Sequence, residues 1–346
     1  MFLVNFFCYQ QHISFQLRLC HSLVLHIFMA AFPASIYSSV NSAGSCNKSF
    51  SRNLKKTVAL HMTIQLAYRQ LSAQLYEAYH QREAANIADM VIEFITGHRK
   101  IDRIIYKYLP LNKDQQKQLE KIAAELLKHR PVQYVLGETW FMDMKLMVNE
   151  SVLIPRPETE ELVEWILKDI KLSRSKKLSL IDIGTGSGCI PIAVKKKKPN
   201  AAVSAIDVSD YALEVAKSNA VKQQVQIDIY NLNFLDEAEW KRLGNYNIIV
   251  SNPPYIKKSE EVSMRDNVLK YEPHLALFVP DEDSLIFYKA IAKFGQTHSE
   301  PQASVYVEIN ESSGKEVAEL FKLSGFNNVI IKKDMQGKDR MVKASV

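Results

Sequence analysis

The sequence has few cysteines, glycines and prolines for its 346 residues, with 4, 11 and 12 of them, respectively. So little glycine and proline excludes a collagen-like or low-complexity chain, and 47% hydrophobic with 24% charged residues excludes a wholly disordered one. Three cysteines lie within the first 46 residues, which leaves Cys189 alone in the rest of the chain. One cysteine forms neither an intrachain disulfide framework nor a cysteine-rich zinc site, and the histidines show no metal-ligand spacing, so we expect no metal.

Acidic residues are absent from the first 60 positions. Residues 1–60 contain five lysines and arginines and many serines, and the first acidic residue of the chain is Glu77. A basic, serine-rich and acid-free N-terminus is typical of a mitochondrial transit peptide. We therefore expect residues 1–60 to be a leader that directs the protein to the mitochondrial matrix. A secretory signal, a start at Met29 and a disordered tail on a cytoplasmic protein remain as alternatives.

The sequence also lacks a long hydrophobic run, and its residues 61–346 lack an excess of charge of one sign. His21, His26 and several serines interrupt the uncharged stretch of the leader, whereas a membrane span needs about 20 mostly apolar residues. Of the 44 basic and 38 acidic residues, the leader holds five basic ones, which leaves 39 against 38 for residues 61–346. Phosphate contacts dominate nucleic-acid affinity. We expect no membrane partner, no stable nucleic-acid binding, and a monomer.

Two small regions precede a larger one. Residues 61–130 have apolar side chains at three- and four-residue spacing and almost no glycine or proline, which predicts a bundle of roughly four helices. This module could dock a substrate or serve as a scaffold. Residues 131–157 predict a β-hairpin linker. Its short apolar runs are Tyr134–Leu136, Thr139–Met142, Lys145–Val148 and Val152–Ile154.

Residues 158–346 alternate apolar strand and helix patterns, which predicts an α/β domain with a mostly parallel, doubly wound sheet. The expected strands are Leu178–Ile183, Ala202–Val208, Gln226–Tyr230, Asn247–Ser251, Ser304–Ile309, Asn328–Lys332 and Arg340–Ala344. The expected helices are Leu162–Ile170, Ile190–Lys198, Tyr211–Lys222 and Ser284–Phe294.

A glycine loop follows the first strand of this domain. Gly184, Gly186 and Gly188 have the spacing G-x-G-x-G, which departs from the dinucleotide pattern G-x-G-x-x-G. Glycines let the backbone turn sharply and let a ligand approach where a Cβ would collide. Asp207 ends the next strand, where a carboxylate can accept both ribose hydroxyls of an adenosine. A tight packing turn is the alternative, but Asp207 favours nucleoside binding.

The segment Asn252-Pro253-Pro254-Tyr255 follows an apolar strand, at the sheet edge where ligands bind in open α/β folds. Two prolines fix backbone dihedrals and remove N–H donors, so the carbonyls are held as acceptors. Asn252 adds an acceptor oxygen on a short side chain. Such a group can hold a planar NH2 by its hydrogens and direct its nitrogen towards an electrophile, while the Tyr255 ring confines it.

Together these features resemble the Rossmann-like class I methyltransferases that use S-adenosyl-L-methionine to modify planar amide or amino nitrogens. Residues 64–346 resemble more closely the HemK/PrmC family, the peptide chain release factor N5-glutamine methyltransferases. This resemblance rests on the segments Arg130–Glu138, Leu153–Glu160, Asn252–Tyr255 and Tyr271–Pro273.

The resemblance implies a methyl transfer from S-adenosyl-L-methionine to the glutamine in the Gly-Gly-Gln loop of a class 1 peptide chain release factor. Asn252 and Pro253 would be catalytic, by accepting hydrogen bonds from the amide NH2, and Pro254 and Tyr255 would complete the substrate site. Asn233 departs from the acidic residue common in the family at that position. The cofactor would contact Gly184, Thr185, Gly186, Ser187, Gly188, Asp207, Phe234 (beside the adenine) and Asn252.

Other interpretations remain. An adenine-N6 methyltransferase could hold a flipped base with the same Asn-Pro-Pro-Tyr segment, and a cofactor-binding assembly protein would need no turnover. Glu308, near the end of a strand, is a candidate acceptor for the released proton, with water as the alternative. Glu158 and Glu160 lie in a first helical turn, where acidic side chains suit the helix dipole without any role in catalysis.

Overall fold

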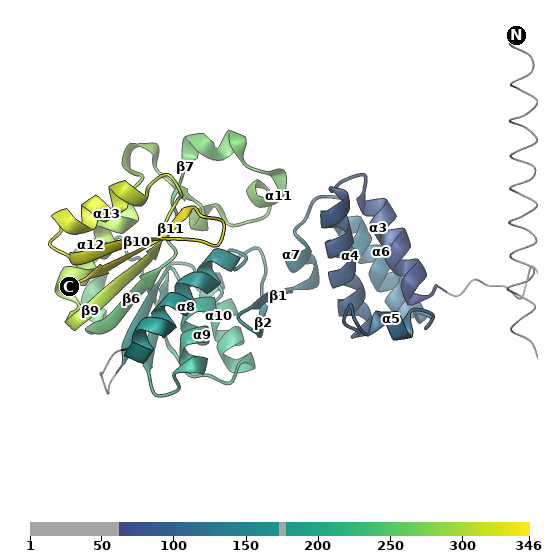
Figure 1. Cartoon of the computed structure of the whole chain (residues 1–346), viewed down its shortest axis with the longest axis horizontal. Coiled ribbons are helices and arrows are strands. Elements are labelled where there is room, and N and C mark those ends of the chain that lie inside the picture. The colour runs from purple at the N-terminus through teal and green to yellow at the C-terminus, as the bar shows by residue number, and fades with distance from the viewer. Residues whose placement is uncertain (1–61, 173–177) are drawn as a thin grey trace, which may run out of the picture. The chain divides into compact units, whose positions relative to one another are not determined.

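The computed structural model describes residues 62–172 and 178–346, which form part of one compact unit from Met62 to Val346 (Figure 1). The expected leader, residues 1–60, lies outside the described residues. No helix in the described ranges is both long enough and apolar enough to cross a membrane.

The helical module has its own apolar core. Ile64, Leu75, Ile92 and Leu126 are among its fully buried members. Gly97 adopts a left-handed conformation (φ 73°) that ends the second helix, and Asn112 begins the last long helix with a reciprocal capping box to Gln115. The helices are α3 (Ile64–Leu75), α4 (Gln81–Thr96), α5 (Arg103–Tyr106) and α6 (Lys113–Leu126).

The linker contains the expected hairpin, but the prediction of a strand at Tyr134–Leu136 is wrong. Strands β1 (Glu138–Phe141) and β2 (Met144–Met147) pair antiparallel around a two-residue turn. The preceding residues form a short helix, α7 (Val132–Leu136), which begins after Pro131 and ends at Gly137 in a left-handed conformation. A proline before a helix and a glycine after it both favour a helix, and here they outweigh the preference of the short apolar run for a strand.

The expected strand at Val152–Ile154 is also not formed, because this segment has no strand partner among the described residues. Its place is fixed by side chains instead. The Tyr134 hydroxyl donates to the Val152 carbonyl at 2.6 Å, and Val152 and Ile154 pack in a small cluster with Tyr134.

A seven-stranded sheet in the order β10-β11-β9-β6-β3-β4-β5 forms the centre of the α/β domain. The pairs among β9, β6, β3, β4 and β5 are parallel, whereas β11 runs antiparallel to both of its neighbours. The mostly parallel sheet is therefore confirmed. Its strands are β3 (Ser179–Ile183), β4 (Ala202–Asp207), β5 (Asp228–Asn231), β6 (Tyr246–Ser251), β9 (Ser299–Glu308), β10 (Asn327–Lys333) and β11 (Asp339–Ser345).

Helices cover both faces of this sheet (Figure 1). Because side chains alternate along a strand, Ile181 packs with α12 and α13 on one face, while Leu180 packs with α8 and α9 on the other. Helix α13 was not among the expected elements. It begins at Gly314, a residue with low helix propensity. The helices are α8 (Pro157–Leu172), α9 (Cys189–Lys197), α10 (Asp210–Lys222), α11 (Asp266–Leu269), α12 (Ile286–Thr297) and α13 (Gly314–Leu323), and a two-stranded sheet pairs β7 (Ile256–Lys257) with β8 (Phe278–Val279).

Candidate active site

The carboxyl ends of four parallel strands meet at one edge of the sheet. The glycine loop follows β3, Asp207 ends β4, Asn252 follows β6, and Glu308 ends β9. A cavity of about 360 Å³ at this edge is lined by the glycine loop, Asp207 and Asn252. The structure thus brings together the groups that the sequence predicted for a ligand site.

The glycine loop is turned by left-handed backbone conformations at Gly184, Gly186 and Gly188, with φ of 72°, 52° and 78°. A Cβ at Gly188 would also lie 3.3 Å from the backbone of Ala216 on α10, so a side chain there would require its neighbours to shift. At Gly184 and Gly186 no atom blocks a Cβ, and the backbone conformation alone favours glycine there.

Asp207 is hydrogen-bonded through both carboxylate oxygens. One accepts from the Gly186 N–H at 2.9 Å and the other from the Ser209 N–H at 3.0 Å. Burial raises the pKa of the Asp207 carboxyl above its ordinary value, and the backbone donors oppose that rise. Each oxygen keeps a further lone pair, so the carboxylate holds the glycine loop in place and can still accept from a ligand hydroxyl.

Asp182 is a member of this region that sequence reasoning missed. Its side chain is 1% exposed, and neither its oxygens nor the Thr185 hydroxyl has a hydrogen-bond partner among the described residues. Burial raises the pKa of Asp182 to about 7. The Thr185 hydroxyl opposes this rise, and Thr185, unlike Asp182, lines the larger cavity. The available signal was an aspartate within the otherwise apolar run Leu180–Ile183.

Phe234 borders the cavity, as do Asn233 and Leu235. The Phe234 ring is largely buried against Trp240, with ring centroids 5.3 Å apart and the planes nearly parallel. The Asn233 side-chain oxygen already accepts from the Leu235 N–H at 3.2 Å. Phe234 therefore shapes one end of the cavity from within an aromatic cluster.

A second cavity, of about 110 Å³, adjoins the first. Asn252 and Pro253 line both cavities, whereas Pro254 lines only the larger and Tyr255 only the smaller one. Burial raises the pKa of the Tyr255 hydroxyl above its ordinary value, so the ring stays neutral. Of the four residues expected to bind substrate, Asn252, Pro253 and Tyr255 share the smaller cavity and Pro254 faces the other one.

Two segments that the sequence separates by more than 100 residues are joined at the smaller cavity. The Arg156 guanidinium, which lines both cavities, donates to the Glu272 carboxylate at 2.6 Å. Glu272 is buried, and its second oxygen accepts from the Ile154 N–H at 3.4 Å. This ion pair fixes the approach to α8, the helix that carries Thr159.

Thr159 is a second residue that sequence reasoning missed. Its hydroxyl donates to the Glu308 carboxylate at 2.7 Å and accepts from the Asn252 side-chain amide at 3.3 Å. The neighbouring Glu160 instead accepts from the Met142 N–H at 2.8 Å and holds the hairpin turn. The pattern of acidic residues in a first helical turn pointed to Glu158 and Glu160. The residue that contacts the site is the threonine between them.

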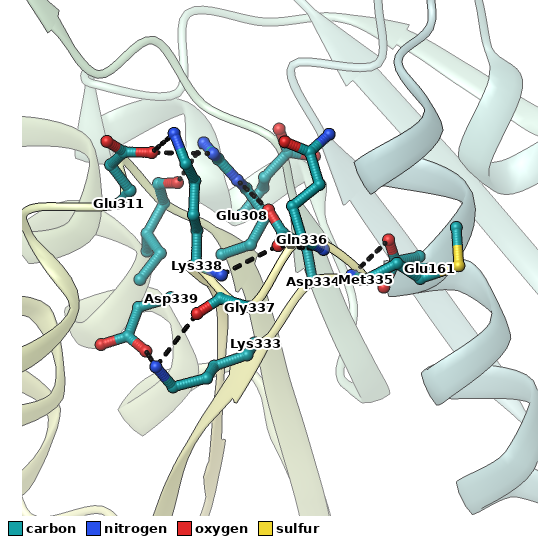
Figure 2. A network of polar contacts seen from close by, with 12 residues as sticks. Glu161, Glu308, Glu311, Lys333, Asp334, Met335, Gln336, Gly337, Lys338 and Asp339 are labelled. Carbon is teal, nitrogen blue, oxygen red and sulfur yellow. Dashed lines mark hydrogen bonds and ion pairs between the residues drawn. The ribbon is translucent and has the colours of Figure 1, made fainter.

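Glu308 is 2% exposed and lines the smaller cavity. Burial raises the pKa of its carboxyl to about 7, against the effect of the Thr159 hydroxyl and the Arg340 guanidinium. Figure 2 shows Glu308 beside the polar network of the β10–β11 turn, where Asp334 and Glu311 pair with Arg340 at 3.3 and 3.6 Å.

Two family models match the chain. The PrmC N-terminal domain matches residues 67–137, and the Methyltransferase small domain matches residues 161–272. The first match covers most of the helical module, and the second contains the glycine loop and the Asn-Pro-Pro-Tyr segment; the hairpin lies between them.

Three curated relatives share the name release factor glutamine methyltransferase. The protein of Flavobacterium psychrophilum is 43% identical and covers 78% of this chain and 95% of its own length. Those of Bacteroides thetaiotaomicron and Streptococcus pneumoniae are 38% and 40% identical, and cover 78% and 77% of this chain and 96% and 93% of their own lengths. The chain therefore belongs to the release factor glutamine methyltransferase family.

Proposed function

We propose that this protein transfers a methyl group from S-adenosyl-L-methionine to the side-chain nitrogen (N5) of the glutamine in the Gly-Gly-Gln motif of class 1 peptide chain release factors. One observation carries the proposal: Asn252 and Pro253 line both cavities. A cofactor in the larger cavity and a glutamine side chain in the smaller one would meet at these two residues. The names of the relatives support the release factor as the substrate.

The larger cavity fits S-adenosyl-L-methionine. Its volume of about 360 Å³ lies in the range of small-molecule sites. Asp207, which lines this cavity, can accept from the ribose hydroxyls. When bound, this cofactor supplies an electrophilic methyl group on a sulfonium.

The smaller cavity fits the glutamine amide. The lone pair of an amide nitrogen is delocalised into its carbonyl, so the nitrogen is a weak nucleophile. Hydrogen bonds from the substrate NH2 to the Asn252 side-chain oxygen and the Pro253 carbonyl would draw electron density onto that nitrogen and align it with the methyl group. Holding two reactants in line reaches effective molarities of about 10⁵ M or more. Positioning by the chain's own acceptors would therefore favour the transfer. The alkylated nitrogen would lose one proton to water, and S-adenosyl-L-homocysteine would leave the larger cavity.

The full-length protein with radiolabelled cofactor tests this function. A release factor, its Gly-Gly-Ala variant and a duplex DNA serve as the three acceptors. We expect label on the release factor only. Label on the Gly-Gly-Ala variant would contradict N5 of this glutamine as the target, and label on the DNA alone would establish the adenine-N6 activity instead.

We also propose that residues 1–60 direct the protein to the mitochondrial matrix, and that it acts there as a monomer without bound nucleic acid. The acid-free leader and the near balance of 39 basic and 38 acidic residues in 61–346 support this. A fluorescent protein fused behind residues 1–60 should enter mitochondria. The same fusion with Arg18, Arg52, Lys55 and Lys56 changed to glutamine should stay outside. An unchanged fusion that stays outside mitochondria would contradict a transit function.

A further inference from the structure

The Asn252 side chain must present its oxygen, not its NH2, to the substrate if it is to accept a hydrogen bond. A primary amide can rotate by half a turn and exchange these two ends with little change in shape. Asn252 lies in the loop after β6 and is only half-buried, so its own surroundings do not prevent this rotation. Some neighbour must therefore distinguish the two ends.

The Thr159 hydroxyl makes that distinction because it has a single hydrogen. Glu308, as a carboxylate, can only accept, so the hydrogen of Thr159 points to Glu308 at 2.7 Å. Both residues are 2% exposed, which keeps competing water away. The remaining lone pairs of the Thr159 oxygen then face Asn252, and they can bind the amide only through its NH2, at 3.3 Å.

We infer that Thr159 and Glu308 are positioning residues that fix the Asn252 amide with its oxygen towards the substrate nitrogen. This inference rests on the proposed function for the identity of the substrate.

Several elements hold Glu308 in place. The Glu308 backbone carbonyl accepts from the Tyr288 hydroxyl of α12 at 3.0 Å. In the sheet, Glu308 on β9 pairs with Met341 on β11. The charged and titratable groups that act on its carboxylate are Arg340 on β11, Arg156 and Glu158 around the start of α8, Tyr255 after β6 and Tyr288 on α12.

Protonation of Glu308 would let the Asn252 amide adopt either of its two orientations. A neutral carboxylic acid can donate to the Thr159 oxygen, and the Thr159 hydrogen is then free to bind the Asn252 oxygen. Since burial raises the pKa of Glu308 to about 7, a larger fraction of molecules loses the fixed orientation as the pH falls through neutrality. We expect kcat to rise with pH between 6 and 8.

Variants of Thr159 test the positioning role. Thr159→Val should lower kcat about 10- to 100-fold, as expected when a catalytic group is misplaced, with the cofactor Kd unchanged within about twofold. Thr159→Ser should restore nearly all of kcat, because it keeps the hydroxyl. Thr139→Val removes another buried threonine hydroxyl, far along the chain in the hairpin, and should leave kcat unchanged. Wild-type kcat in Thr159→Val would overturn the inference.

Glu308→Gln gives a signature that a merely structural role would not. The glutamine NH2 can donate to the Thr159 oxygen, as a protonated Glu308 can, so kcat at pH 8 should fall to about the wild-type value at pH 6, and the fall of kcat between pH 8 and pH 6 should disappear. A retained fall would show that another group titrates and would overturn the role of Glu308. If the wild-type protein labels no release factor at all, the proposed function fails instead.

The orientation can be followed without any substrate. In protein labelled with ¹⁵N-asparagine, the NH2 signal that is missing from Asn252→Ala belongs to Asn252. This signal should move on titration between pH 6 and 8 and in Thr159→Val, and should stay in place in Thr139→Val. An Asn252 NH2 signal that moves neither with the pH nor in Thr159→Val would overturn the inference, whatever the substrate is.

Discussion

The two cavities of the active site are built in different ways. The larger one depends on backbone: three left-handed glycines turn a short continuous loop, and Asp207 is tied to that loop by a backbone N–H. The smaller one depends on side chains from distant parts of the chain: Asn252 and Glu308 line it, and both are hydrogen-bonded to the hydroxyl of Thr159, which lines the larger cavity. A site made from a local loop tolerates changes in distant elements, whereas a side-chain network requires every member to be in place.

This difference predicts that changes in the smaller cavity will stop the chemistry while leaving cofactor binding intact. The largest effect is expected for Asn252→Ala, which removes the side-chain acceptor for the substrate NH2. We expect kcat to fall by about 10³-fold, near the upper end for loss of one preorganised polar group. Cofactor affinity, measured by calorimetry, should change by less than about threefold, because Asn252 contributes only one wall of the larger cavity.

A strong loss of cofactor binding in Asn252→Ala would break the comparison, because the two cavities would then depend on the same residue for both tasks. Retained methyl transfer would remove Asn252 from the mechanism. Pro280→Ala, in the loop after β8, is a matched control for a side-chain truncation outside both cavities.

The converse change is Asp207→Ala in the larger cavity. It removes two hydrogen bonds to a charged acceptor within the protein and those expected to the ribose. The cofactor Kd should rise about 10- to 100-fold, since hydrogen bonds to charged groups contribute about 1.5–3 kcal/mol. At saturating cofactor, kcat should recover to near the wild-type value. A low kcat that saturation does not restore would mean that the glycine loop also positions the substrate.

The smallest effect is expected in the helical module, which contributes no lining residue to either cavity. Asn112→Ala removes the reciprocal cap of α6 and should lower the free energy of unfolding by about 1 kcal/mol. Denaturation followed by circular dichroism measures this change. The cofactor Kd and the kcat on a short Gly-Gly-Gln peptide should stay at wild-type values, and a loss of either would show that the module supports the cavities directly.

Many features of the fold followed from local patterns. The strands at the centre of the sheet have apolar runs bounded by turns, and Gly97 and Asn112 are residue types that commonly end and begin helices. The error at Tyr134–Leu136 has a clear reason, since a short run of apolar and aromatic residues suits a strand or a helix equally and the flanking Pro131 and Gly137 decide between them. The helix that begins at Gly314 was missed because its first residue is a poor helix former.

Sequence reasoning found the site residues that lie at the ends of strands and missed those that only their neighbours in the fold identify. Gly184, Asp207 and Asn252 are recognisable because each follows or ends a strand, and the ends of parallel strands meet at one sheet edge. Thr159 and Asp182 have no such sign. A threonine in a first helical turn and an aspartate in a strand are ordinary residues until their neighbours are known.

By itself, the sequence determined the family, the parallel sheet, the glycine loop and the Asn-Pro-Pro-Tyr segment. Each of these depends on continuous stretches of residues that have a local conformational preference. Only the tertiary structure decided which way the hydrogen bonds run. The hydrogen of Thr159 points to Glu308, 149 residues away, and its lone pairs to Asn252, 93 residues away. The direction of a hydrogen bond depends on which donors and acceptors lie within reach in the folded protein, and that proximity has no local trace in the chain.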